Sequence, residues 1–151
     1  MSNQRSLAQT LTLLFGIVFL ATGVLGFIPG ITTNVGDMDF AGKDSPSELL
    51  GIFQVSVLHN IVHLLFGIAA LALSRTWEGA RTYLLWAGVI YIVLFVYGLF
   101  VSAGDDANFV PINMADDWLH LGFGIVLLGS WYLTRTGDEV STQRPATTSG
   151  M

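Results

Sequence analysis

Residues 51–74 read GIFQVSVLHNIVHLLFGIAALALS and contain no Asp, Glu, Lys or Arg. This stretch is long enough to cross the hydrocarbon core of a bilayer, which takes a helix of about 20 apolar residues. Three further charge-free runs occupy residues 6–36, 82–104 and 118–134. A helix satisfies its own backbone hydrogen bonds in lipid, so we expect each run to form one membrane-spanning helix. The expected spans are residues 9–28, 53–73, 83–102 and 117–134.

The composition indicates a membrane protein. Of the 151 residues, 52% are hydrophobic and only 11% are charged, whereas a soluble domain has about 25% charged residues. A soluble protein of this size could not bury so much apolar surface. The net charge of −5 excludes the basic surface that nucleic acids require. The absence of cysteine excludes disulfides and thiolate-bound metals. The sequence therefore predicts an all-α integral membrane protein, a four-transmembrane-helix bundle over residues 1–134 within the lipid bilayer.

The distribution of charge predicts how the spans are oriented. One side would hold both termini and five basic residues, namely Arg5, Arg75, Arg81, Arg135 and Arg144. The opposite side would hold Lys43 as its basic residue, together with eight acidic residues. Basic residues concentrate on the cytoplasmic side of membrane proteins, so the expected orientation is N-in/C-in, with both termini cytoplasmic. The polar segment 135–151 is expected to form a disordered cytoplasmic tail.

A short motif occurs twice in the chain. Residues 63–71 read HLLFGIAAL and residues 120–128 read HLGFGIVLL, with six of nine positions identical at an offset of 57. The match favours two related helical hairpins, spans 1–2 and spans 3–4, arranged about an axis along the membrane normal. Against this, Leu, Phe and Gly are common throughout the chain, and the first and third spans show no comparable match. The sequence leaves both interpretations open.

All three histidines fall on helix faces that also carry other polar groups. His59 and His63 are four residues apart and therefore share one face of the second span. Asp116 and His120 have the same spacing in the fourth span. Counting residues to the basic ends places His63 and His120 at similar depths, in the outer half of the membrane. The sequence predicts one cluster, made of His59, His63, His120, Asp116 and Asp117, with Asn60, Ser56 and Tyr91 as supporting polar residues.

Several functions fit such a cluster. Imidazole and carboxylate groups could hold a divalent metal, two facing histidines could ligate a haem iron, and alternating His and Asp groups could relay protons. Polar groups could also do no more than hydrogen-bond the helices together. Small residues indicate where helices pack closely, either within the bundle or in a homo-oligomer or another membrane-protein complex. The predicted helix-packing glycines are Gly16, Gly23, Gly26, Gly67 and Gly124.

Two segments carry a resemblance to a known family. FQVSVLHNIVHLLFG at 53–67, together with NMADDWLHLGFG at 113–124, resembles the bacterial four-span membrane proteins of the family called domain of unknown function 4383. The similarity extends over about residues 7–134. It implies a multi-pass protein of the bacterial plasma membrane, and it implies no activity and no catalytic residues.

The sequence favours a protein without enzymatic activity. It contains no nucleophile-and-base pair, phosphate-binding loop or nucleotide-binding fingerprint. We therefore expect a multi-pass membrane protein with a His-lined helix interface in the outer half of the membrane, which is either structural or binds a small cation. The alternatives are a redox membrane protein linked to haem or quinone, and a small transporter or channel component.

Overall fold

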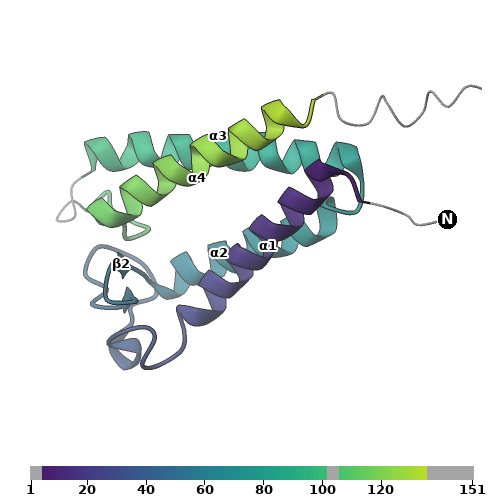
Figure 1. Ribbon diagram of the computed structural model, residues 1–151. Coiled ribbons are helices and arrows are strands. Elements are labelled where there is room, and N and C mark those ends of the chain that lie inside the picture. The colour runs from purple at the N-terminus through teal and green to yellow at the C-terminus, as the bar shows by residue number, and fades with distance from the viewer. Residues whose placement is uncertain (1–4, 102–105, 136–151) are drawn as a thin grey trace, which may run out of the picture.

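The computed structural model describes residues 5–101 and 106–135 (Figure 1). It confirms an all-helical fold with four helices: α1 Leu7–Leu25, α2 Val57–Leu73, α3 Trp77–Phe100 and α4 Met114–Leu133. The α1–α2 connection also contains a short 3-10 turn, η1 Val35–Asp37, and the antiparallel strands β1 Glu48–Leu49 and β2 Phe53–Gln54. Two helices, α1 and α3, are long and apolar enough to cross a membrane. The predicted tail lies outside the described residues, except for Arg135.

The helix boundaries follow from local capping. Each helix begins after a residue whose side-chain oxygen accepts a hydrogen bond from a first-turn backbone N–H; these residues are Ser6, Ser56, Thr76 and Asn113. Two helix starts differ from the expected spans by four residues or more. The second helix begins at Val57 rather than residue 53, because Phe53 and Gln54 pair with β1. The third begins at Trp77 rather than residue 83, because Thr76 caps it.

The four helices form two antiparallel hairpins, α1–α2 and α3–α4. Figure 1 shows that the hairpins meet near the α2–α3 connection and diverge toward the other end. The described ends of the chain lie at the narrow end, whereas the strands and the start of α4 lie at the wide end (Figure 1). The arrangement therefore places Arg5, Arg75 and Arg135 at one end of the molecule, and the acidic α1–α2 connection at the other.

Small residues bring the two helices of each hairpin close together. A Cβ atom on Gly23 of α1 would lie 2.8 Å from the backbone oxygen of Asn60 in α2, and one on Gly67 would lie 2.8 Å from the backbone nitrogen of Leu20. Gly124 of α4 packs against Ile92 of α3 in the same way. The other two predicted packing glycines, Gly16 and Gly26, also lie against α2. These close approaches leave no room for larger side chains.

The two hairpins repeat the same contacts. Residue numbers in α4 exceed those of the equivalent α2 positions by 57, and those in α3 exceed α1 positions by 72. Under these offsets the contact of Gly67 with Leu20 matches that of Gly124 with Ile92. Three further equivalences follow: the packing of Gly26 on Asn60 and of Gly98 on Asp117, the caps Ser56 and Asn113, and the aromatic residues Phe19 and Tyr91. This agreement favours related hairpins over a chance similarity.

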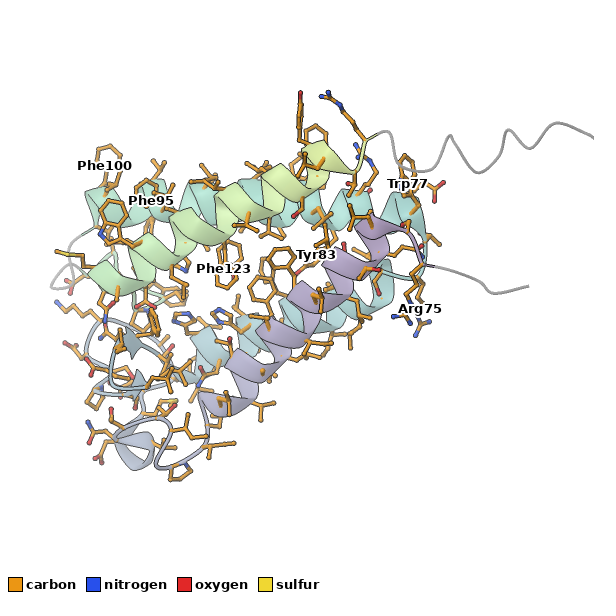
Figure 2. All side chains as sticks on the ribbon, viewed as in Figure 1. Arg75, Trp77, Tyr83, Phe95, Phe100 and Phe123 are labelled. Carbon is orange, nitrogen blue, oxygen red and sulfur yellow. The ribbon has the colours of Figure 1, made fainter. Side chains whose placement is uncertain are left out.

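The hairpins meet through four aromatic rings, here called the aromatic tetrad: Phe19, Phe66, Tyr91 and Phe123. The rings of Phe19 and Tyr91 stack with centroids 5.3 Å apart and planes inclined at 15°. Phe66 and Phe123 each contact both of these rings, at centroid distances between 5.3 and 5.9 Å. Figure 2 shows Phe123 pointing from α4 into the space between the hairpins. Ring packing therefore joins the two halves here, and nearer the narrow end Thr12 Oγ1 of α1 donates to the backbone oxygen of Ala80 in α3 at 3.2 Å.

Candidate functional site

The three histidines lie next to the aromatic tetrad, and all three are buried. The rings of His59 and His63 stack, with centroids 4.8 Å apart and planes inclined at 18°. His63 contacts Phe19, and His120 contacts Tyr91, with centroid distances of 6.0 Å and 5.4 Å. These two contacts are equivalent under the internal repeat. The structure thus brings together the three histidines and Tyr91, which the sequence had placed on different helices.

Backbone carbonyls orient two of the histidine rings. His59 Nδ1 donates to the carbonyl oxygen of Pro111, and His63 Nδ1 donates to that of His59, both at 3.1 Å. A carbonyl can only accept, so both Nδ1 atoms carry the proton and the Nε2 atom of a neutral ring is left as an acceptor. His120 differs, because its buried Nδ1 has no hydrogen-bond partner within the described part of the chain. A buried polar atom without a partner is uncommon and requires an explanation.

Two cavities border the histidines. The first, of about 330 Å³, lies between α1 and α4, and the second, of about 360 Å³, lies between α2 and α3. Four residues line both cavities, namely His59, His63, Tyr91 and His120. We call these four residues the shared wall. The remaining lining is almost entirely apolar, as in small-molecule sites where a few polar groups set the orientation of the ligand.

The two predicted acidic residues have separate positions. Asp116 lines the first cavity, where its Oδ2 accepts hydrogen bonds from the backbone nitrogens of Asn113 and Gln54 at 2.9 and 3.1 Å. It thereby ties β2 to the start of α4. Asp117 instead packs against Gly98 and lines a different cavity, of about 420 Å³, at the C-terminal end of α3. The structure does not bring Asp117 to the histidines, because it faces α3 rather than the space between the hairpins.

The supporting polar residues also occupy separate positions. Ser56 caps α2 by accepting from the backbone nitrogen of His59 at 3.1 Å. Asn60 is fully buried on the α1 side, where its amide packs against Gly26 and donates to the Met38 sulfur at 3.6 Å. Tyr91 belongs to the shared wall. Among these three residues, Tyr91 therefore lines the candidate site, whereas Ser56 and Asn60 support the helices that form it.

Sequence reasoning missed two residues that shape the site. Phe19 stacks on Tyr91 and contacts His63, and Pro111 orients His59 through its carbonyl oxygen. The offset of 72 between α1 and α3 would have identified Phe19, but only one short motif at an offset of 57 is visible in the sequence. Across residues 5–101 and 106–135, no group of three or more His, Asp or Glu side chains is arranged to hold a metal ion.

Comparisons with known proteins identify one family. The model of the family described as "Domain of unknown function (DUF4383)" matches residues 9–132. A search of curated proteins and a search of solved structures each find no match. The match covers most of the chain, including every helix that contributes to the candidate site. The chain therefore belongs to the DUF4383 family.

Proposed function

We propose that this protein is a non-enzymatic, multi-pass protein of the bacterial plasma membrane that binds a small lipid-soluble ligand between its two hairpins. All four helices cross the bilayer, and both termini face the cytoplasm. The observation that carries the binding function is the shared wall, where three histidines and a tyrosine meet beside two apolar cavities. The His120 ring supports it, because its buried Nδ1 has no partner among the described residues and a rotation of the ring would offer that nitrogen to a ligand atom.

Two features support the four-span topology. The narrow end carries basic residues and both described chain ends, whereas the wide end is acidic, as the positive-inside rule requires. The helices α2 and α4 have 17 and 20 residues, lengths of about 26 and 30 Å at a rise of about 1.5 Å per residue. Each packs along an apolar partner helix that is long enough to cross a membrane, α2 along α1 and α4 along α3.

Cysteine labelling tests the topology without background, because the natural chain has no cysteine. The variants Asp37→Cys, Arg75→Cys and Asp106→Cys place a thiol at three exposed sites. We expect a membrane-impermeant maleimide to label positions 37 and 106 in intact spheroplasts, and position 75 only after permeabilisation. External labelling of both Asp37→Cys and Arg75→Cys would show that α2 does not cross, and the four-span proposal would fail.

Photo-crosslinking tests the binding site itself. A diazirine-bearing alkane added to purified protein in lipid nanodiscs should label peptides from both cavities. Filling both cavities with Thr22→Trp and Leu94→Trp should reduce that labelling at least tenfold, whereas Val126→Trp on the lipid-facing side of α4 should not. Equal labelling of the natural protein, the variant with both cavities filled and the Val126→Trp variant would contradict a binding site between the hairpins. A Soret band or stoichiometric metal in the purified protein would instead favour the haem or cation alternative.

A further inference from the structure

The two cavities are equivalent under the internal repeat. The first helices of the hairpins contribute three equivalent pairs of lining residues at an offset of 72: Ala21 and Val93, Thr22 and Leu94, Leu25 and Tyr97. The second helices contribute His63 and Phe66 to one cavity, and His120 and Phe123 to the other, at an offset of 57. The cavities are also of nearly equal volume, about 330 and 360 Å³. The fold therefore builds the same site twice, once on each side of the shared wall.

Each cavity offers a polar edge against apolar sides. The shared wall carries the His120 ring, whose buried Nδ1 has no partner among the described residues and would reach a ligand after a rotation of the ring. It also carries the His63 Nε2 atom, an acceptor to which no described residue donates. Because His63 and His120 are equivalent positions, each half of the molecule brings one such ring to the wall. A hydroxyl group could donate to the acceptor nitrogen, and a hydroxyl or carbonyl oxygen could accept from a ring N–H. The wall therefore fits a ligand with oxygens of either kind.

Charge excludes anionic ligands. Seven acidic residues lie at the wide end of the described chain, with Lys43 as the basic residue among them: Asp37, Asp39, Asp44, Glu48, Asp106, Asp116 and Asp117. A carboxylate or phosphate group would be repelled by this surface and would lose its hydration in an apolar cavity. A neutral head group is not repelled by the acidic surface and loses much less hydration energy in the cavity.

The ring-rich lining points to an aromatic head group. Tyr91 contacts both cavities, and Phe123 and Phe66 occupy equivalent positions in their walls. Flat rings pack well against such side chains in offset or edge-to-face geometry. We propose that the protein binds two copies of a neutral, lipid-soluble ring compound of the quinone or quinol class, one in each cavity. The ring oxygens face the shared wall, and the alkyl tails extend along the apolar sides. This inference rests on the proposed function, because it names the ligand of the same site.

Native mass spectrometry of the full chain in nanodiscs tests the inference, with a decyl-substituted benzoquinol as the probe and dodecanoate as a chain-matched anionic comparison. We expect up to two benzoquinol molecules per chain, and at least tenfold weaker binding of dodecanoate. Thr22→Trp and Leu94→Trp should each reduce the maximum from two to one. His120→Phe should weaken binding at both sites at least tenfold, because it keeps the ring and removes its nitrogens. Val126→Trp serves as the control.

Each outcome separates the ligand class from the site. Binding of one benzoquinol per chain, unaffected by one of the two tryptophan variants, would overturn the paired sites. Equal binding of dodecanoate would overturn the neutral ligand class. If the diazirine probe labels both cavities but benzoquinol neither binds nor competes, the ligand class fails and the binding site stands. Should Thr22→Trp or Leu94→Trp fail to fold, Ala21→Trp and Val93→Trp repeat the test at the exposed rims of the same cavities.

Discussion

The interface within each hairpin differs in kind from the interface between the hairpins. Within a hairpin, glycines such as Gly23 and Gly67 allow the backbones of two helices to touch, and nothing larger fits. Between the hairpins, Phe19 and Tyr91 meet through their rings, and cavities remain beside them. Close backbone packing leaves no space between the helices of a hairpin, whereas the ring contacts leave cavities between the hairpins. The difference teaches that backbone packing defines each hairpin, and that the space between the hairpins is where the proposed ligand would bind.

The largest effect is expected from removing the central ring between the hairpins. Phe19 is fully buried and contacts three rings of the tetrad together with His63. By the cavity rule for buried aromatic residues, Phe19→Ala should lower the free energy of unfolding by about 3–5 kcal/mol. Thermal unfolding in detergent, followed by circular dichroism, measures this, with Phe19→Leu as a milder control. An unchanged melting temperature for Phe19→Ala would show that the rings do not hold the hairpins together.

A smaller loss of stability is expected when one methyl group is added between the helices of a hairpin. Gly23→Ala would place Cβ 2.8 Å from a backbone oxygen that cannot move aside, so α1 and α2 must separate. Overpacking of this kind costs about 1–3 kcal/mol. Gly122→Ala is the matched control on α4, since its Cβ would meet nothing within 4 Å, and better helix propensity should stabilise it by up to about 1 kcal/mol. Equal effects of the two substitutions would contradict tight packing within the hairpins.

The smallest effect on stability is expected from breaking the ion pair that links the loops of the two hairpins. Lys43 Nζ donates to Asp106 Oδ1 at 2.7 Å, and this hydrogen bond holds the pKa of the Asp106 carboxyl below its ordinary value. A lowered acid pKa means that the contribution is present at neutral pH and is lost as the pH falls through the lowered pKa. Because Asp106 is almost fully exposed, the effect on stability should be slight.

Titration of the Asp106 carboxyl by NMR measures this link directly. In the natural protein its pKa should lie below the usual aspartate value of about 3.9, and Lys43→Gln should return it toward that value. Melting temperatures of the two proteins at neutral pH should agree closely. A pKa that is the same with and without Lys43 would show that the contact between the loops is not formed in solution.

Much of the fold was predictable from the sequence, and the site was predictable only in part. Charge-free runs located four helices, but they could not distinguish the strand residues Phe53 and Gln54 from helix, because apolar runs do not mark a cap. Helical spacing put His59 and His63 on one face. It could not show that Asp117 turns toward Gly98, because the rotation of α4 depends on its packing against α3.

The sequence by itself determined the helices, the polarised charge and the small residues that pair α1 with α2 and α3 with α4. These follow from local properties: hydropathy, capping and side-chain size along one chain. Only the tertiary structure decided that the internal repeat extends to α1 and α3, where Phe19 and Tyr91 stack. It also decided that His63 and His120 reach one wall between two equivalent cavities. The physical reason is that contacts between the hairpins depend on how the hairpins are placed relative to each other. The periodicity of residues within a single helix does not specify that placement.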